Sequence, residues 1–388
     1  MNLAKRVFGI DESVTLQITS KAKKMAKEGI DVVGLAAGEP DFDTPKHIKD
    51  AAVKAIGEGF TKYTPSSGVP ELIAAIADKF KKDNNLSYEP SQIVVSNGAK
   101  HSLYNIFQAV CEAGDEVLIP SPYWLSYPAM VGLAEAKPVF AGTTADNGFK
   151  ITEKELKSKI TGRTKCLILN SPSNPTGGVY DKADLEMIAA IAVKHNLLVV
   201  SDEIYEKLIY DGRRHYSIAS LGKDIYDRTI TVNGVSKIYS MTGWRIGYAA
   251  GPLKIMKAIA NLQSHATSNP ASMSQMATLA ALTQDQSFIE GMRSEYEKRR
   301  DYMVSRVSAM KNVSCFKPGG AFYLFCDVSR TGRDSVRTAT ALLEEAKVAV
   351  IPGEPFGAPE WIRLSFATGM DKIRKAMDRM EEYFKKNG

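Results

Sequence analysis

A lysine and an arginine stand close together in the stretch VNGVSKIYSMTGWRIGY, which covers residues 232–248. Lys237 comes shortly after an apolar run that ends at Val232, and Arg245 follows it in the same stretch. A lysine amine can form a Schiff base with an aldehyde, and an arginine guanidinium can hold a phosphate. A lysine in a turn is usually a solvated loop residue, so this pair gains meaning only from the rest of the chain.

Polar or turn-forming residues also follow several other short apolar runs. They occupy residues 96–100 (SNGAK), 120–124 (PSPYW), 170–175 (NSPSNP) and 202–205 (DEIY). Taken singly, each has a structural explanation: Gly98 and Ala99 open a helix, Trp124 packs, and Asn174 and Asp202 cap turns. The functional interpretation is that free N–H groups at the helix start bind a phosphate and that the Trp124 face covers a planar aromatic ligand.

The elements that must position these residues can be read from the apolar pattern. Seven short aliphatic runs closed by turn residues predict buried strands, at residues 92–98, 115–120, 137–142, 165–170, 197–202, 229–234 and 244–251. Between two of them, Leu185, Ile188 and Ala192 recur at helical spacing, which is typical of a crossover between parallel strands. We therefore predict an α/β fold with a largely parallel sheet and helices on both faces, so that the polar segments converge at the carboxyl ends of the strands.

A second, smaller α+β domain is predicted near the end of the chain. Apolar residues outline a long amphipathic helix over residues 288–310 and a C-terminal helix over residues 373–384. We assign residues 46–284 to the large domain, and residues 1–45 with 285–388 to the small one.

Composition excludes several functional classes. The chain has 388 residues, no apolar run long enough to span a membrane, and no apolar segment near its start that resembles a signal peptide. The net charge of +6 is spread among interleaved lysines and acids, so we expect no nucleic-acid partner. The four cysteines form no CxxC pair and lie near no histidine cluster, which predicts no metal site and favours a reducing cytoplasm.

A series of motifs runs in order along nearly the whole chain. The motifs are AAGEPDFDTP, KYTPSSGVPELIAAIA, SNGAKHSLYNIFQAV, PSPYW, NSPSNPTGGVY, SDEIYEKLIY, VNGVSKIYSMTGWRIGY and IRLSFA. In residue types, order and approximate spacing, the series resembles the aspartate aminotransferase family of class I pyridoxal-phosphate enzymes, which have the fold called type I. The resemblance implies pyridoxal 5′-phosphate as the cofactor, because a lysine, a strand-end carboxylate and a phosphate-binding helix start are what that cofactor requires.

The resemblance implies a role for each residue around the cofactor. Lys237 would carry it as a Schiff base, and Asp202 would keep its pyridine nitrogen protonated. Asn174 and Tyr205 would hydrogen-bond its phenolic oxygen, while Trp124 would lie against its ring. The cofactor-binding set is completed by residues at or beside its phosphate: Gly98, Ala99, Lys100, Ser236, Arg245 and, from the other subunit of a homodimer with shared active sites, Tyr63.

The resemblance also implies how an amino acid is recognised. Arg363 would bind the α-carboxylate in a bidentate manner beside Gly38, Asn174 and Trp124. The alternative for Arg363, an exposed arginine on an edge strand, has less support because its neighbours are apolar.

A second carboxylate on the substrate has two candidate contacts. In one branch of the family a lysine directly follows the phosphate-binding turn, and Lys100 stands there, so Lys100 and Thr15 would read a distal carboxylate. An ordinary lysine in the first turn of a helix is an equally good interpretation of Lys100. Residues 11–13 are Asp-Glu-Ser, without the basic residue that accompanies prephenate activity in this branch, so prephenate is not predicted as a substrate.

The implied reaction is transfer of the amino group of aspartate to 2-oxoglutarate in a ping-pong scheme, with Lys237, Asp202 and Tyr205 as the catalytic residues. An aminotransferase acting on alanine or an aromatic amino acid, and a pyridoxal-phosphate lyase of the same fold, stay as alternatives. A non-catalytic regulator is a third alternative, but no DNA-binding segment or missing cofactor motif supports it.

Overall fold

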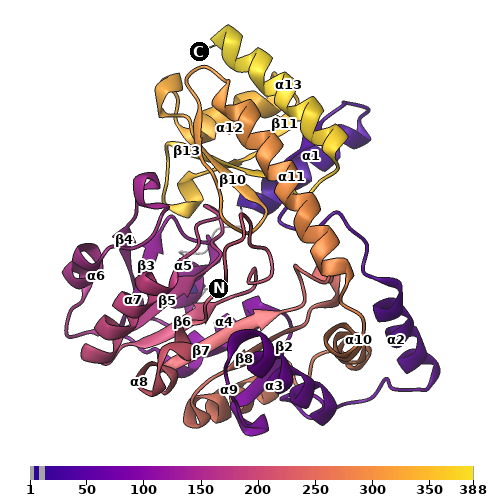
Figure 1. Cartoon of the computed structure of the whole chain (residues 1–388), viewed down its shortest axis with the longest axis vertical. Coiled ribbons are helices and arrows are strands. Elements are labelled where there is room, and N and C mark those ends of the chain that lie inside the picture. Colours follow the sequence, from indigo (N-terminus) through magenta and orange to yellow (C-terminus); the bar gives the residue numbers. More distant parts are fainter. Residues whose placement is uncertain (1–3, 8–13, 388) are drawn as a thin grey trace.

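The structure, a computed structural model, describes residues 4–7 and 14–387, with the side chains of residues 5 and 14–16 left out. Its centre is a seven-stranded sheet with the strand order β2-β8-β7-β6-β5-β3-β4 (Figure 1). The strands are β2 (Ile93–Ser96), β3 (Glu116–Ser121), β4 (Lys137–Gly142), β5 (Thr164–Asn170), β6 (Leu198–Asp202), β7 (Thr229–Gly234) and β8 (Gly247–Ala250). All seven predicted strands are therefore present, and the predicted α/β fold is confirmed.

The sheet is parallel except around β8. The strand pairs β4–β3, β3–β5, β5–β6 and β6–β7 are parallel, whereas β8 runs antiparallel to both β7 and β2. Strand β8 is shorter than the run predicted at residues 244–251. Residues 242–244 form a 3₁₀ turn, and Arg245 adopts a left-handed conformation with φ 56°.

Helices cover both faces of this sheet because successive strand residues point to opposite sides. In β5, Cys166 and Ile168 pack into one apolar cluster, whereas Leu167 and Leu169 pack into the other. The first cluster joins the sheet to α4 (Ala99–Val110), α5 (Ser126–Leu133) and α9 (Leu253–Ala266), and the second joins it to α6 (Glu153–Lys159), α7 (Lys182–Lys194) and α8 (Lys223–Tyr226). Buried residues on both faces explain why these strands are continuous apolar runs.

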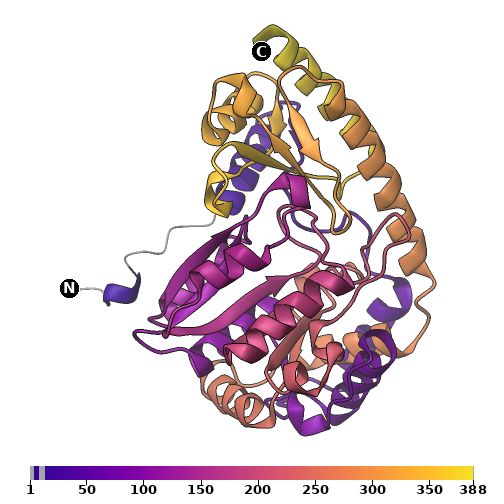
Figure 2. The same ribbon diagram turned by 60° about the vertical axis from the view of Figure 1, so that its left-hand side comes forward.

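A separate small sheet lies beside the large one. Its order is β12-β13-β10-β9, all antiparallel, with β9 (Ser314–Phe316), β10 (Tyr323–Asp327), β12 (Ile351–Pro352) and β13 (Trp361–Ser365). A short parallel pair joins β1 (Val33–Gly34) to β11 (Val348–Ala349). Figures 1 and 2 show α1 (Val14–Lys27), α12 (Ser335–Glu344) and α13 (Met370–Asn387) gathered around this sheet.

The long helix α11 (Phe288–Ser308) runs from the large sheet region to the small one (Figure 2). The helix ends at Ser308, although Met310 was expected to lie inside it. Met310 still packs in the same apolar cluster as the buried residues of α11. The remaining helices, α2 (Lys46–Gly57), α3 (Pro70–Asn84) and α10 (Ser272–Thr283), lie together near β2 (Figure 1). The exact limits of the two domains, 46–284 against 1–45 with 285–388, stay a prediction.

No helix within the described ranges is long and apolar enough to cross a membrane.

Candidate active site

A cavity of about 420 Å³ opens at the carboxyl ends of β5, β6 and β7. The small sheet closes it from the other side through Tyr323 of β10 and Arg363 of β13. Eleven of the residues predicted from the sequence line this cavity: Gly38, Ala99, Lys100, Trp124, Asn174, Asp202, Tyr205, Ser236, Lys237, Arg245 and Arg363. Residues from both sheets and from α4 therefore meet at one place, as expected for an α/β ligand site.

Lys237 lies in the turn that follows β7, and its side chain points into the cavity. This turn is closed by backbone hydrogen bonds from Ser240 to Lys237 and from Met241 to Ser236. The Lys237 Nζ donates to the carbonyl oxygen of Gly38 at 2.6 Å. Burial, helped by the positive charge of Arg363, lowers the pKa of Lys237 from 10.5 to about 8. A substantial fraction of this amine is therefore neutral, and so nucleophilic, near neutral pH.

Asp202 ends β6 and is buried at the base of the cavity. Tyr127 donates its hydroxyl proton to Asp202 Oδ2 at 2.7 Å, and the backbone N–H of Ile204 lies 3.3 Å from Oδ1. Burial raises the pKa of Asp202 from 3.8 to about 6, although the bond from Tyr127 works against this shift. The residue does cap its own turn through Ile204, and it also presents a carboxylate to the cavity that is costly to keep charged without a cationic partner.

Tyr205 faces the cavity one turn after Asp202. Its hydroxyl oxygen lies 2.8 Å from that of Tyr323, which comes from β10 of the small sheet. The Lys237 Nζ is 5.8 Å from the centre of the Tyr205 ring. Burial raises the pKa of Tyr205 above its usual value, so the phenol stays protonated and serves as a hydrogen-bond donor.

The start of α4 and Arg245 form one side of the cavity. Gly98 precedes α4 with φ 86°, and a Cβ atom on it would lie 2.4 Å from Nη2 of Arg245. A Cβ atom on Gly247 would lie 2.1 Å from the backbone nitrogen of Ala99, so β8 passes directly beneath the helix start. Glycine at both positions lets the guanidinium and the free N–H groups of α4 approach each other, which creates an anion-binding corner.

Lys100 and Trp124 lie next to this corner. The Lys100 Nζ is 4.9 Å from the centre of the Trp124 ring, and burial with nearby Arg245 lowers the pKa of Lys100. Trp124 also packs edge-on against Tyr127, with ring centres 5.3 Å apart. Lys100 belongs to the first turn of α4 and lines the cavity, so its position agrees with either interpretation and does not decide between them.

Arg363 is only 2% exposed and occupies β13, which lies between β12 and β10. The alternative of an exposed arginine on an edge strand is therefore wrong. Its Nη1 donates to Asn174 Oδ1 at 2.9 Å and its Nη2 donates to the Ala36 carbonyl oxygen at 3.0 Å. Its guanidinium carbon lies 4.4 Å from the centre of the Tyr323 ring. The Nε is buried without a hydrogen-bond partner among the described residues. Because a guanidinium has five N–H groups, the two bonds to Asn174 and Ala36 leave further donors on Nη1 and Nη2.

Among the predicted residues that the structure describes in full, two do not line the cavity. Gly98 lies immediately behind it, against Arg245. Tyr63 is 91% exposed on the surface of the chain. The side chain of Thr15 lies outside the described residues, as do Asp11, Glu12 and Ser13.

Several cavity residues were missed in the sequence. Tyr127 and Tyr323 support Asp202 and Tyr205, and Asn170 links them to β5 by donating to the Asp202 carbonyl oxygen at 3.0 Å. Asn170 was already part of the predicted polar segment 170–175, but no role was assigned to it. Further lining residues come from α1 and from loops near it: Thr19, Lys23 and Glu39. Glu39 belongs to the motif AAGEPDFDTP, but no pattern in the sequence distinguishes Thr19 and Lys23 from other surface residues.

Pyridoxal 5′-phosphate fits this set of donors. The cavity presents an amine of lowered pKa, a buried carboxylate suited to a cationic ring nitrogen, and an anion-binding corner. Its lining carries five basic side chains (Lys23, Lys100, Lys237, Arg245 and Arg363) and two acidic ones (Glu39 and Asp202). This excess of positive charge suits a phosphate together with a carboxylate-bearing substrate.

Comparisons with known proteins agree with the geometry. The sequence profile described as aminotransferase class I and II matches residues 30–380. The chain is 52% identical to an aspartate aminotransferase of Bacillus sp. (strain YM-2), over 99% of both proteins. It is 49% identical to an aspartate aminotransferase of Bacillus subtilis (strain 168), over 100% of both. The solved structure of the aspartate aminotransferase from Rhizobium meliloti is 41% identical, covers 100% of both chains and superimposes with a TM-score of 0.96. The protein thus belongs to the class I and II aminotransferase family, and it uses pyridoxal 5′-phosphate as that family does.

Proposed function

We propose that this protein transfers the amino group of aspartate to 2-oxoglutarate, which yields oxaloacetate and glutamate. The observation that carries the proposal is the meeting of four groups in one cavity: the Lys237 amine, the Asp202 carboxylate, the Arg245 corner of α4 and the buried Arg363. Relatives named aspartate aminotransferase, which share about 50% sequence identity with this chain over its full length, support aspartate as the amino donor.

The cofactor would be held by several parts of the site. Lys237 would bind its aldehyde carbon covalently, Asp202 would pair with its ring nitrogen, and Tyr205 would donate to its phenolic oxygen beside Asn174. The N–H groups at Ala99, the Ser236 hydroxyl and the Arg245 guanidinium would hold the phosphate, while Trp124 would lie along the ring. When bound, pyridoxal phosphate supplies an electron-poor ring that takes up the negative charge left when the substrate Cα loses its proton.

Lys237 is the group that moves the proton. Its pKa of about 8 lies near the working pH, which is the condition for a lysine to act as a general base. The neutral Nζ accepts the proton from the substrate Cα and later releases it. Its hydrogen bond to the Gly38 carbonyl oxygen keeps the amine on the cavity side of the turn.

Arg363 binds the α-carboxylate of any amino acid substrate. Asn174 and the Ala36 carbonyl oxygen each accept one N–H and so fix the plane of the guanidinium, whose remaining N–H groups on Nη1 and Nη2 would bond the carboxylate. A carboxylate accepting from Arg363 gains a charge-assisted hydrogen bond from a buried guanidinium. Recognition at this residue does not depend on the substrate side chain.

Lys100 is our candidate for the distal carboxylate of aspartate, together with Thr15. Burial, together with the nearby charge of Arg245, lowers the pKa of Lys100, and a substrate carboxylate beside it would stabilise the charged amine. Lys23 on α1 lines the same cavity and adds positive charge at its rim.

We also propose that the active enzyme is a homodimer with shared sites. Large apolar side chains stand exposed on and after α2, namely Val53, Ile56 and Phe60, with Tyr63 close by in sequence. A second copy covering this surface would bury them and could bring Tyr63 to the phosphate corner of the other subunit. We place the protein in the reducing cytoplasm, because its four cysteines are free thiols.

A steady-state panel tests the proposed reaction. Aspartate, alanine and an aromatic amino acid are each offered with 2-oxoglutarate, and the matching 2-oxo acid and glutamate are measured. Aspartate should have the highest kcat/KM, and Lys237→Ala should abolish turnover. A higher kcat/KM for alanine or the aromatic donor would overturn the substrate assignment. Product formation without any glutamate would indicate a lyase, and light scattering that gives a monomer would overturn the shared site.

A further inference from the structure

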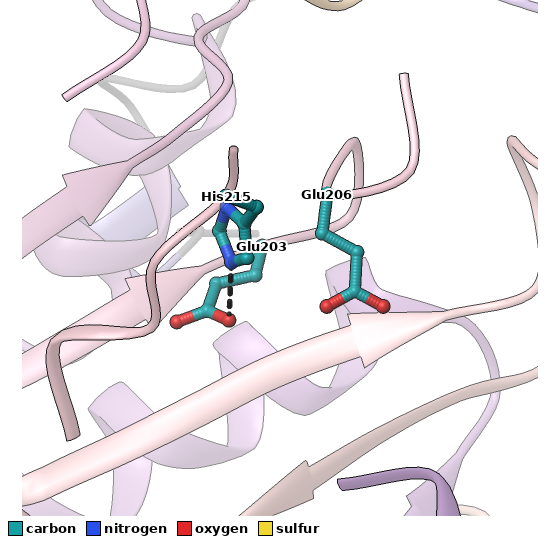
Figure 3. A group of neighbouring side chains, drawn as sticks. All are labelled: Glu203, Glu206 and His215. Carbon is teal, nitrogen blue, oxygen red and sulfur yellow. Dashed lines mark hydrogen bonds and ion pairs between the residues drawn. The ribbon is translucent and has the colours of Figure 1, made fainter. Parts of the chain in front are cut away.

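The turn that follows β6 has two chemically different sides. Asp202 and Tyr205 face the cavity. Glu203 directly follows Asp202 in the sequence and Glu206 directly follows Tyr205. These two glutamates are 1% and 8% exposed and lie outside the cavity lining. Figure 3 shows Glu203, Glu206 and His215 as neighbouring side chains.

These two carboxylates belong to a buried cluster, which we call the carboxylate network and define as Lys79, Asn84, Glu203, Glu206 and His215. Lys79 forms an ion pair with Glu206 and donates to Asn84 Oδ1 at 2.7 Å. Asn84 Nδ2 donates to Glu206 Oε2 at 2.6 Å and lies 3.2 Å from Glu203 Oε2. His215 Nε2 is 2.9 Å from the same Glu203 oxygen (Figure 3). Two residues of α3, Lys79 and Asn84, are thereby joined to the catalytic turn.

A metal ion is one interpretation of this cluster, because the ligand atoms of Glu203, Glu206 and His215 lie within 4.8 Å of one another. Each carboxylate oxygen already accepts from a protein group, however. Glu203 Oε1 accepts from the hydroxyls of Ser201 at 2.8 Å and Ser217 at 2.7 Å, and the other oxygens accept from the groups described above. The ammonium of Lys79 already supplies a positive charge beside Glu206, so no bound cation is needed to balance this carboxylate.

The carboxylate network places charged side chains in the core, where their loss of hydration disfavours folding. Burial alone would raise the pKa of Glu206, but Lys79, His215 and Asn84 lower it to about 2, so the residue is ionised at neutral pH. Buried ion pairs contribute little net stability compared with apolar residues of the same size, whereas they fix geometry through directed bonds. A role in placing the turn explains these residues better than a role in stability.

We propose that the carboxylate network positions the Asp202–Tyr205 turn and thereby sets the environment of the bound cofactor. The backbone connections make this link direct. The N–H of Glu203 bonds to the Val232 carbonyl oxygen of β7, and the N–H of Glu206 bonds to the Glu203 carbonyl oxygen. Any shift of Glu203 or Glu206 therefore moves the backbone that carries the two cavity residues. Lys79 and Glu206 are positioning residues in this scheme, which rests on the proposed function because it concerns the same cofactor site.

The test uses the full-length double variant Lys79→Met/Glu206→Met, which removes both charges of the ion pair with side chains of similar size. The dissociation constant for pyridoxal phosphate and the pH midpoint of the absorbance change of the bound cofactor are measured, with kcat and KM. We expect roughly 10-fold to 100-fold weaker cofactor binding, a displaced midpoint, and a lower kcat with KM for 2-oxoglutarate nearly unchanged. The single variant Lys79→Arg keeps the positive charge and should retain most of the wild-type affinity for pyridoxal phosphate.

A matched control removes an ion pair at the opposite ends of the strands. Lys165 pairs with Asp115 at 2.9 Å, just before β3, and Lys165→Met/Asp115→Asn should leave the cofactor constant and the midpoint at their wild-type values. A folded Lys79→Met/Glu206→Met variant with wild-type cofactor affinity and midpoint would overturn the proposal, even if its Tm fell.

If that double variant does not fold, the single variant His215→Leu tests the proposal in the same assays. It should weaken cofactor binding roughly 3-fold by removing one bond to Glu203. Wild-type affinity and midpoint in this variant would overturn the proposal. Failure of the wild-type protein itself to bind pyridoxal phosphate would instead refute the proposed function.

Discussion

The lowered pKa of Lys237 gives a prediction that can be tested without any cofactor. Burial and the charge of Arg363 bring this pKa from 10.5 to about 8. At pH 7.5, roughly a quarter of the amines are then neutral, against about one in a thousand for an unperturbed lysine. The difference corresponds to about 3 kcal/mol, which is the free energy by which the site disfavours the ammonium form.

The assay is competitive labelling of amines in the cofactor-free protein across pH 6–11, with the Lys237 peptide quantified by mass spectrometry. The labelling rate of Lys237 should rise as the pH increases through about 8 and then level off. Two variants should shift this midpoint in opposite directions. Arg363→Met removes a repelling cation and should raise the midpoint, whereas Asp202→Asn removes an attracting anion and should lower it.

A wild-type midpoint near the ordinary value of 10.5 would refute this reasoning, because it would mean that the amine is solvated. Equal midpoints in both variants would show that the neighbouring charges do not act on Lys237. An exposed lysine such as Lys46, whose side chain is 86% exposed, serves as the internal reference within the same sample.

Three further predictions concern ligand recognition. Lys100→Ser should raise the KM for aspartate roughly 10-fold to 100-fold while changing that for alanine less than about 3-fold, because only aspartate has a distal carboxylate; equal effects in steady-state kinetics would remove Lys100 from this role. Arg363→Lys should raise the KM of every amino donor by roughly 10-fold or more, since an ammonium cannot replace the planar guanidinium, and a change confined to one donor would contradict it. Gly98→Ala would bring a Cβ atom to 2.4 Å from Arg245 Nη2, so the guanidinium must move, and binding of inorganic phosphate and pyridoxal phosphate measured by calorimetry should weaken together. Unchanged phosphate binding in that variant would show that this corner does not hold the anion.

Much of the site followed from the sequence because parallel strands place their carboxyl ends along one edge of a sheet. Lys237, Asp202 and the start of α4 come directly after buried apolar runs, so the strand prediction alone was sufficient to bring them together. Arg363 was assigned through the family resemblance, and its apolar neighbours in the sequence then argued against an exposed position. The order of the motifs then supplied the family, which comparison confirmed.

The tertiary structure decided which distant side chains support these residues. Tyr127 reaches Asp202 and Tyr323 reaches Tyr205 across a separation of many residues, and no local pattern encodes such a contact.

The stretch DEIYE shows the same limit within a single turn. The sequence contains three carboxylates there, but only the folded backbone determines that Asp202 enters the cavity while Glu203 and Glu206 turn toward α3. The chain thus specifies its strands and its chemistry locally, through apolar runs and the residues that end them. The side on which each charge is buried depends on packing between distant elements, because a buried charge is stable only where partners from those elements are present.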